Sequence, residues 1–294
     1  MRGTVEKSLS GFYYLRPDGG GAVVRCTAKG TLRQAEFESP LVGDRAEFEI
    51  RGKTALLTEL LPRSNSFIRP PVANIGTLVI VASAASPAAD PFLIDRMTVQ
   101  AESVGAEPVI CFTKLDLARS GLAETYRAAG FQTPEVSSET GEGIAALAEL
   151  LAGAGVCALT GNSGAGKTSL LNALGLDLPT GEVSDRLGRG RHTTRHVELH
   201  TVNHRAGTLR IIDTPGFSSF ETVTETVPAN ELAENFRDFA PHLGKCRYRD
   251  CIHRAEPDCA VTRAVASGGI AAARYESYLR LLASAEEKAA AKYR

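Results

Sequence analysis

The order of two short motifs constrains the fold of this 294-residue chain more than any other feature. The first motif, Thr113-Lys-Leu-Asp116, ends an apolar stretch and places a carboxylate where the edge of a purine base could pair with it. The second, Gly161-Asn-Ser-Gly-Ala-Gly-Lys-Thr168, is a complete phosphate-binding loop of the form G-x-x-x-x-G-K-[ST]. In the usual domain the base-reading motif follows the phosphate loop. The inverted order therefore predicts a circularly permuted α/β domain.

Three regions of different character predict a multidomain protein. Residues 1–68 contain short alternating stretches separated by glycines, which is typical of a small β-barrel of the oligonucleotide-binding kind (OB-fold), although another small β-module would share the pattern. The expected strands are Gly11–Leu15, Ala22–Cys26, Asp44–Ile50 and Thr54–Leu61. Residues 69–226 alternate apolar strands and helices, as in a doubly wound α/β domain. Residues 227–294 hold a Cys/His cluster and end in a helix-forming segment, Ala271–Tyr293.

Composition limits the class of protein and its compartment. With 43% hydrophobic and 23% charged residues the chain reads as an ordinary globular protein. A net charge of −1 gives no general attraction to nucleic acid, so such binding would need local patches. The first residues lack the apolar core of a signal peptide, and the longest apolar run falls far short of the roughly 18 residues of a membrane span. We expect a cytoplasmic protein without a membrane partner.

The phosphate loop predicts a nucleotide site with magnesium. Its backbone N–H groups can surround phosphate oxygens, Lys167 can reach the β- and γ-phosphates, and the Thr168 hydroxyl can bind Mg²⁺. A plain glycine-rich turn is the weak alternative. The predicted contacts with the nucleotide at this loop are Gly161, Asn162, Ser163, Gly164, Ala165, Gly166, Lys167, Thr168 and Ser169.

A second magnesium residue is predicted at Asp213-Thr-Pro-Gly216, which follows the apolar stretch Leu209–Ile212. Asp213 would hold Mg²⁺ through water, and the amide of Gly216 could contact the γ-phosphate. Phe217 stands where a water-orienting glutamine would be found in Ras-like enzymes. Another group must therefore position the attacking water.

The glycine- and arginine-rich stretch 187–194 is the candidate for that role. Thr193 or Thr194 could bind Mg²⁺, and His192 could position the water, so that these three residues and Lys167 form the predicted catalytic set. The alternative is a basic loop with an exposed histidine. The arginines in and just after this stretch could instead, or also, face RNA phosphates; they are Arg189, Arg191 and Arg195.

The early motif predicts guanine recognition. The Asp116 carboxylate can accept hydrogen bonds from N1 and N2 of guanine, which adenine lacks, and the Lys114 stem can lie along the ring. Thr113 stands where asparagine is usual and would weaken the tethering of the loop. An auxiliary base-contact loop is expected at Val136–Thr140, although such a stretch is more often an ordinary turn. The predicted contacts with the base are Thr113, Lys114, Leu115, Asp116, Ser137 and Ser138.

Four soft ligands near the C-terminus predict a structural zinc site. Cys246, Cys251, His253 and Cys259 supply three thiolates and one imidazole, which suit tetrahedral Zn²⁺. A disulfide pair or unlinked core cysteines are the alternatives. Basic residues lie between these ligands and could contact RNA phosphates or simply face solvent; they are Lys245, Arg247, Arg249 and Arg254. The remaining cysteines lie on expected strands and should be buried; they are Cys26, Cys111 and Cys157.

In this order, these motifs resemble the bacterial small ribosomal subunit biogenesis GTPases, which are circularly permuted and ribosome-dependent. The resemblance also includes the stretch Arg69–Asn74 and the pair Asp95-Arg96, and it spans nearly the whole chain. It implies an OB-fold, a permuted P-loop GTPase domain and a small zinc-binding α domain. It further implies slow hydrolysis of GTP to GDP and phosphate, stimulated by the small subunit, and a nucleotide-switched, rRNA-binding role in late subunit maturation. The implied cofactors are one Zn²⁺ and Mg²⁺ with GTP. The implied partners are the small subunit, its rRNA and other assembly factors, with the protein itself a monomer.

Two other classes of function remain open at this point. A small-molecule kinase would share the phosphate loop, but Asp116 and the motif at Asp213 argue against it. A nucleic-acid-binding module with a vestigial nucleotide site is disfavoured because Lys167, Thr168 and Asp213 are intact.

Overall fold

The computed structural model describes residues 1–30, 39–52, 54–68, 70–178, 197–213 and 227–291. Several residues singled out from the sequence lie outside these ranges; they are Arg69, Arg189, Arg191, His192, Thr193, Thr194, Arg195, Gly216 and Phe217. The described residues fall into two compact units. The first comprises residues 1–77, 144–160 and 167–217, and the second comprises residues 78–143, 161–166 and 218–294. The boundaries proposed from the sequence, at residues 68 and 226, stay predictions.

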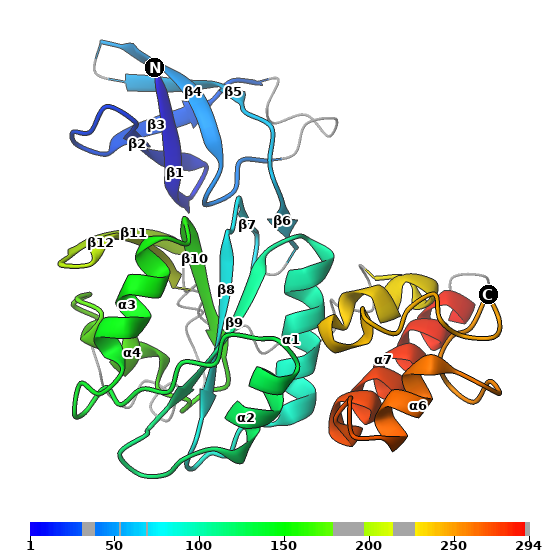
Figure 1. Cartoon of the computed structure of the whole chain (residues 1–294). Coiled ribbons are helices and arrows are strands. Elements are labelled where there is room, and N and C mark those ends of the chain that lie inside the picture. The colour runs from blue at the N-terminus through cyan, green and yellow to red at the C-terminus, as the bar shows by residue number, and fades with distance from the viewer. Residues whose placement is uncertain (31–38, 53, 69, 179–196, 214–226, 292–294) are drawn as a thin grey trace, which may run out of the picture. The chain divides into compact units, whose positions relative to one another are not determined.

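The N-terminal part of the first unit is a closed five-stranded barrel (Figure 1). Its strands are β1 (Arg2–Leu9), β2 (Phe12–Pro17), β3 (Val24–Ala28), β4 (Arg45–Arg51) and β5 (Thr54–Leu60). Hydrogen bonding runs in the order β2-β3-β5-β4-β1, and the pairing of β1 with β2 closes the ring. Fully buried apolar side chains fill its interior, among them Val5, Leu15, Phe48 and Leu57. The predicted OB-fold is confirmed.

Two strands of the barrel differ from the sequence-based expectation. No strand was predicted at β1, because its polar residues obscure the alternation; Glu6 in this strand is buried and paired with Arg16. Strand β3 begins at Val24 rather than Ala22. The glycine turn before it extends through Gly21, whose φ of 108° suits glycine, so the strand starts later.

The rest of the first unit includes the strand before the phosphate loop and the helix after it, β10 and α4, among other elements. Its elements are β6 (Ser66–Phe67), β7 (Val72–Ala73), α3 (Ile144–Ala152), β10 (Val156–Gly161), α4 (Lys167–Ala173), β11 (Glu198–His204) and β12 (Gly207–Asp213). Strands β11 and β12 form an antiparallel hairpin. Strand β12 also runs parallel to β10, with Asp213 in register with Leu159. Both strands therefore end at the same edge of the sheet.

The second unit holds the strands and helices of the base-reading part. They are β8 (Thr77–Ser83), α1 (Pro91–Ser103), β9 (Glu107–Thr113) and α2 (Gly121–Ala128). Every residue of β8 is buried, as its continuous apolar sequence predicts for a strand covered on both faces. The side chain of Asp90 caps α1 by accepting from the backbone N–H of Phe92. After α2, Glu135 forms an isolated bridge with Phe112 of β9.

The C-terminal region of the second unit is helical. Its elements are η2 (Ala229–Asn235), η3 (Arg237–Phe239), α6 (Ala260–Ala266) and α7 (Ala272–Ala291). Phe236, Phe239 and Tyr278 pack together at ring-centroid distances of 5.0 to 5.4 Å and form the centre of its core. Leu281 and Leu282 of α7 complete this core, as the apolar spacing of the last helix predicts.

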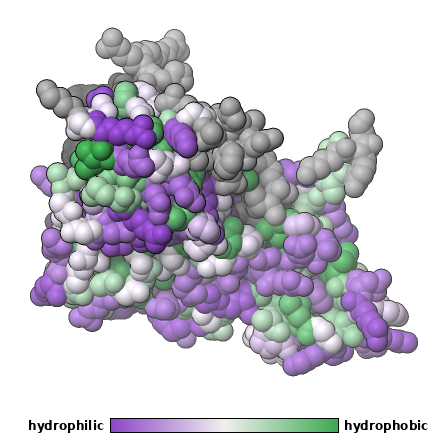
Figure 2. Space-filling model, turned by 90° about the horizontal axis from the view of Figure 1, so that it is seen from above, coloured by the Kyte–Doolittle hydropathy of each residue, from purple (hydrophilic) through white to green (hydrophobic). Residues whose placement is uncertain are grey.

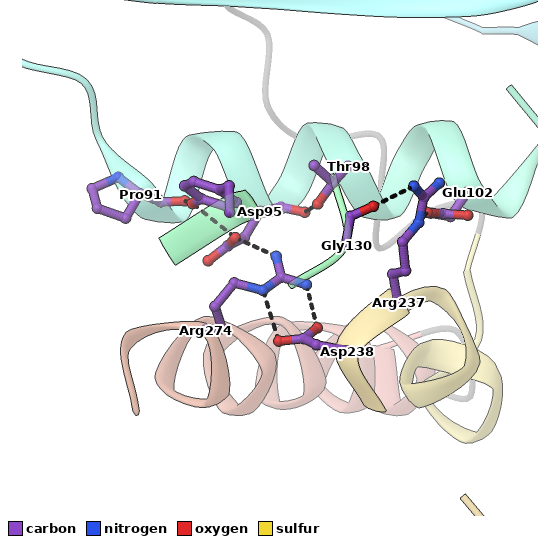
Figure 3. Close-up of polar contacts among 9 residues, drawn as sticks. Pro91, Asp95, Thr98, Glu102, Gly130, Arg237, Asp238 and Arg274 are labelled. Carbon is purple, nitrogen blue, oxygen red and sulfur yellow. Dashed lines mark hydrogen bonds and ion pairs between the residues drawn. The ribbon is translucent and has the colours of Figure 1, made fainter. Parts of the chain in front are cut away.

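A buried arginine joins this region to α1 (Figure 3). Nη1 of Arg274, on α7, donates to Oδ1 of Asp95, on α1, at 2.6 Å. Nε and Nη2 of the same guanidinium donate to both carboxylate oxygens of Asp238, at 3.0 and 2.5 Å. Burial raises the pKa of Asp95, and the charge of Arg274 opposes that rise. The side chains of Arg274 and Asp95 are each 1% exposed, so each charge is stabilised by the other and not by solvent.

One face of the molecule is mostly polar. On the face drawn in Figure 2, hydrophilic residues predominate, and apolar residues occur only in small patches between them. No helix in the described ranges has both the length and the apolar character needed to cross a bilayer.

Candidate nucleotide-binding site and metal centre

The phosphate loop has the local geometry that its glycines predict. Strand β10 leads through residues 162–166 into α4, which begins at Lys167. Gly161 has a φ of 142°, and a Cβ there would lie 2.2 Å from the carbonyl oxygen of Val81. A side chain is therefore excluded at this position, and the backbone can pass close to β8. Lys167 is half-buried, whereas Thr168 and Ser169 are exposed at the first turn of α4.

Asp213 lies at the end of β12, and its side chain is half-buried. Its parallel register with Leu159 puts the carboxylate beside the strand that leads into the phosphate loop. This agrees with the rule that ligands of α/β domains bind at the carboxyl ends of parallel strands. The other residues expected around a γ-phosphate lie outside the described ranges; they are His192, Thr193, Thr194 and Gly216.

Thr113 joins the base-reading motif to the phosphate loop. Its buried hydroxyl donates a hydrogen bond of 2.5 Å to the backbone carbonyl of Ala165. The backbone of Thr113 also accepts from the N–H of Ala84 at 2.9 Å. A threonine at this position thus ties the two loops together through its hydroxyl, where the sequence suggested a weakened tether. The base-reading loop and the phosphate loop are therefore connected, although asparagine is absent from this position.

The Asp116 carboxylate is oriented by a second loop. The hydroxyl of Ser137 donates to Oδ1 of Asp116 at 2.5 Å. Ser137 is completely buried, and its oxygen also accepts from the backbone N–H groups of Glu139 and Thr140. The N–H of Leu115 donates to the carbonyl of Val136 at 3.1 Å and joins the two loops a second time. A carboxylate has about four lone-pair sites, so Asp116 can still accept from a base.

Lys114 takes an unusual backbone conformation at the end of β9. Its φ of 63° lies in the left-handed region, and its ammonium donates to the carbonyl of Ser86 at 2.6 Å. This bond joins the base-reading motif to the segment that follows β8. Ser86 was not predicted from the sequence, and the small-residue run after β8 carries no signal that would have identified it. Ser138 is half-buried beside Ser137.

The Cys/His cluster has the dimensions of a tetrahedral zinc centre. Nδ1 of His253 lies 3.4 Å from each of the three sulfur atoms, and the sulfurs of Cys246 and Cys259 are 3.8 Å apart. Zn–S bonds of about 2.3 Å at tetrahedral angles place two sulfurs about 3.8 Å apart. All four ligand atoms lie within 4.8 Å of one another. The four residues thus fit Zn²⁺, and their convergence disfavours unlinked core cysteines.

Groups that the sequence did not identify hold the ligand loop in place. The Glu256 carboxylate accepts from the N–H groups of Ile252 and Arg254, at 2.7 and 2.8 Å. The hydroxyls of Tyr275 and Tyr278, on α7, donate to the carbonyls of His253 and Ile252. These bonds fix the backbone around the ligands in the way that outer-shell partners do in metal sites.

The basic residues between the ligands differ in their ion pairs. Arg254 is paired with Glu286 at 2.6 Å, and Arg247 with Asp258 at 3.3 Å. Lys245 and Arg249 are exposed, and neither pairs with a carboxylate in the described ranges. The remaining cysteines are buried on strands, as predicted; they are Cys26, Cys111 and Cys157.

Two known protein family models match this chain. Residues 60–223 match the model of the RsgA GTPase, and residues 2–55 match that of the RsgA N-terminal domain. A small ribosomal subunit biogenesis GTPase RsgA of Geobacillus thermodenitrificans is 42% identical over 296 residues, covering 97% of this chain and 98% of the relative. The protein of the same name from Caldanaerobacter subterraneus is 38% identical over 301 residues, covering 100% and 99%.

Two solved structures share the fold. YloQ, a circularly permuted GTPase, superposes with a TM-score of 0.79 at 32% identity, covering 98% of this chain and 95% of YloQ. YjeQ from Thermotoga maritima gives a TM-score of 0.79 at 29% identity, covering 97% and 98%. The circular permutation predicted from the motif order is confirmed.

Proposed function

Since this chain belongs to the RsgA GTPase family, we propose that it hydrolyses GTP on the small ribosomal subunit and acts late in the maturation of that subunit. The observation that carries this proposal is the joined pair of loops, in which Thr113 binds the phosphate loop and Ser137 orients Asp116. Such an arrangement selects a guanine nucleotide and holds its phosphates at the same time. The partners are GTP, the subunit and its rRNA, with other assembly factors; the protein acts as a monomer in the cytoplasm.

Guanine is selected at Asp116. Its carboxylate accepts from the N1 and N2 donors of guanine, and adenine offers no such pair of donors. Ser137 holds one oxygen of this carboxylate, which fixes the direction of the other toward the base. The stem of Lys114, with its ammonium bound to Ser86, covers one face of the ring.

The phosphates are bound by the loop that starts at Gly161. Its backbone N–H groups surround the phosphate oxygens, and the ammonium of Lys167 neutralises charge that develops on them during hydrolysis. The hydroxyl of Thr168 and the carboxylate of Asp213 offer the oxygen ligands that Mg²⁺ prefers. Mg²⁺, when bound with GTP, supplies further positive charge to the phosphates.

The attacking water is positioned by His192 in this proposal. Phe217 cannot orient water through hydrogen bonds, so a polar group elsewhere must do so. His192, Thr193 or Thr194 and the amide of Gly216 would complete the site around the γ-phosphate. Zn²⁺ bound by Cys246, Cys251, His253 and Cys259 would stabilise the C-terminal region, and the exposed Lys245 and Arg249 would contact rRNA phosphates.

The decisive experiment measures the initial rate of phosphate release from GTP with and without purified small subunits, with ATP as the control. We expect a large stimulation for GTP and none for ATP. The absence of stimulation, with GTP still tightly bound, would remove the ribosome from the proposal and leave the nucleotide site intact. Equal activity on ATP would instead favour a small-molecule kinase.

Base recognition is tested with a matched pair of serines. Ser137→Ala removes the donor to Asp116 and should weaken GTP binding about tenfold, since a hydrogen bond to a charged group contributes roughly 1.5–3 kcal/mol. Ser103→Ala removes a hydroxyl on α1 that donates to the carbonyl of Gln100, and it should leave the affinity unchanged. Equal affinities for the two variants would contradict the orienting role of Ser137.

A further inference from the structure

The barrel is attached to the β11–β12 hairpin at one defined point in the first unit. Strands β1 and β11 pair antiparallel, with Lys7 opposite Glu198, and the side chains of these two residues form an ion pair of 2.6 Å. The hydroxyl of Thr201, on β11, lies 3.3 Å from Oε1 of Glu6, on β1. These contacts bring the barrel against the strand pair that ends at Asp213.

A cavity of about 470 Å³ lies at this junction. Its walls come from both sides and include Thr4, Glu6, Arg16 and Arg45 of the barrel and Thr201 and Arg210 of the hairpin. This volume falls in the range of about 300–1,000 Å³ that is common for ligand sites. No function assigned above uses it.

The charges around the cavity favour an anion. Arg16 is bound by both oxygens of Glu6, and Arg45 donates to Asp18 at 2.5 Å, so both carboxylates are already paired. Arg210 is exposed, and no carboxylate in the described ranges pairs with it. The site therefore has three guanidinium groups against two carboxylates, and a cationic ligand would meet no free acid.

Arg45 offers donors to such a ligand. Its side chain is 42% exposed, although its Nε is buried and has no hydrogen-bond partner among the described residues. Guanidinium groups match the planar pairs of oxygens of phosphates, with which they form two parallel hydrogen bonds.

We propose that this cavity binds a backbone phosphate of RNA between Arg45 and Arg210. The inference rests on the proposed action on rRNA and adds a site that couples the barrel to the nucleotide. A phosphate held there contacts the barrel and the hairpin together. Because β12 ends at the proposed Mg²⁺ residue Asp213, a shift of the hairpin on hydrolysis would alter the cavity. RNA at this site thereby favours one nucleotide state.

The test compares two arginines of one hairpin in the full-length protein. Arg210→Gln removes a cavity charge, and Arg205→Gln makes the same change at the turn between β11 and β12. Binding of a short fluorescein-labelled single-stranded RNA is followed by anisotropy over a range of salt concentrations. Loss of one phosphate contact should weaken binding about tenfold and lower the slope of log K against log[salt] by roughly 0.7, whereas Arg205→Gln should change neither.

Several outcomes would overturn the inference. Equal affinities and salt slopes for Arg210→Gln and the unchanged protein would show that no phosphate is bound there. Displacement of the RNA by a polyglutamate peptide as readily as by unlabelled RNA would assign the site to an acidic protein. Binding of inorganic phosphate that Arg210→Gln abolishes, with an RNA affinity that the same substitution leaves unchanged, would assign it to a free anion.

Separate measurements test the coupling of the RNA site to the bound nucleotide and the proposed function. The labelled RNA should bind with different affinities in the presence of GDP and of a non-hydrolysable GTP analogue, and Arg210→Gln should reduce that difference. An unchanged difference would contradict the coupling. If small subunits do not stimulate GTP hydrolysis but Arg210→Gln still lowers the salt slope, the proposed function fails and the RNA site stands.

Discussion

Replacing Arg274 by methionine should strongly destabilise the C-terminal region. The guanidinium is 1% exposed and compensates two carboxylates, those of Asp95 and Asp238 (Figure 3). Methionine has a similar length but no charge, so both acids would remain buried without their partner. Removing one member of a buried ion pair costs about 3–5 kcal/mol. At about 2–4 °C per kcal/mol for a protein of this size, the midpoint of thermal unfolding should fall by roughly 6–20 °C.

Tyrosine fluorescence provides the assay, because the chain contains no tryptophan. The hydroxyl of Tyr126 donates to the Asp95 carboxylate at 2.9 Å. The ring of Tyr278 packs against that of Phe236, and the guanidinium of Arg274 lies over the same Phe236 ring. Their emission in a urea titration reports on the unfolding of this region. Arg247→Met is the matched control, since the Arg247–Asp258 pair is more than 60% exposed on both sides and should contribute about 0–1 kcal/mol.

The pH dependence of the stability loss tests whether the uncompensated charge of Asp95 causes it. Burial already raises the pKa of Asp95, and loss of Arg274 should raise it further. The folded variant then binds more protons than the unfolded chain between the unfolded pKa, about 3.9, and the raised folded pKa. Its stability should therefore fall as the pH rises through that window, so the penalty of Arg274→Met is smaller at about pH 5 than at about pH 7. Asp95→Asn added to Arg274→Met should recover part of the loss.

The reasoning would be refuted if Arg274→Met cost no more than Arg247→Met. A penalty that is independent of pH, with no recovery from Asp95→Asn, would show that lost packing rather than uncompensated charge causes the effect.

Three further predictions concern the nucleotide site and the metal centre. Thr113→Val removes the donor to the Ala165 carbonyl and should weaken binding of a fluorescent GTP analogue about tenfold, whereas Thr113→Ser should retain the affinity; equal losses would contradict the tether. Gly161→Ala forces a Cβ to within 2.2 Å of the Val81 carbonyl oxygen and should abolish GTP binding in the same titration. Gly121 has open space around its Cβ position, so Gly121→Ala should leave GTP binding unchanged. Zinc, measured with a chromophoric chelator, should be released as the pH falls, because thiolates and imidazole must lose protons to bind the metal; Cys259→Ser should lower the zinc content and Cys26→Ser should not.

Much of the site follows from the sequence because its chemistry depends on local order. A phosphate loop requires glycines, a lysine and a hydroxyl within a few residues, and the run from Gly161 to Thr168 contains all of them. The metal cluster is similarly compact, and its four ligands converge as their spacing indicates. The motif order alone predicted the circular permutation, because the sheet is unchanged when the chain begins elsewhere.

Only the tertiary structure decided which distant residues complete these local motifs. The bond from Thr113 to Ala165, the ion pairs of Arg274 and the cavity between the barrel and the hairpin all join residues far apart in the chain. Nothing in the local pattern distinguishes Arg274 from the exposed arginines, or Glu6 from an ordinary surface glutamate. Burial makes the difference, because a charge removed from water must find its partner inside the fold, and that partner can come from any element that packs against it.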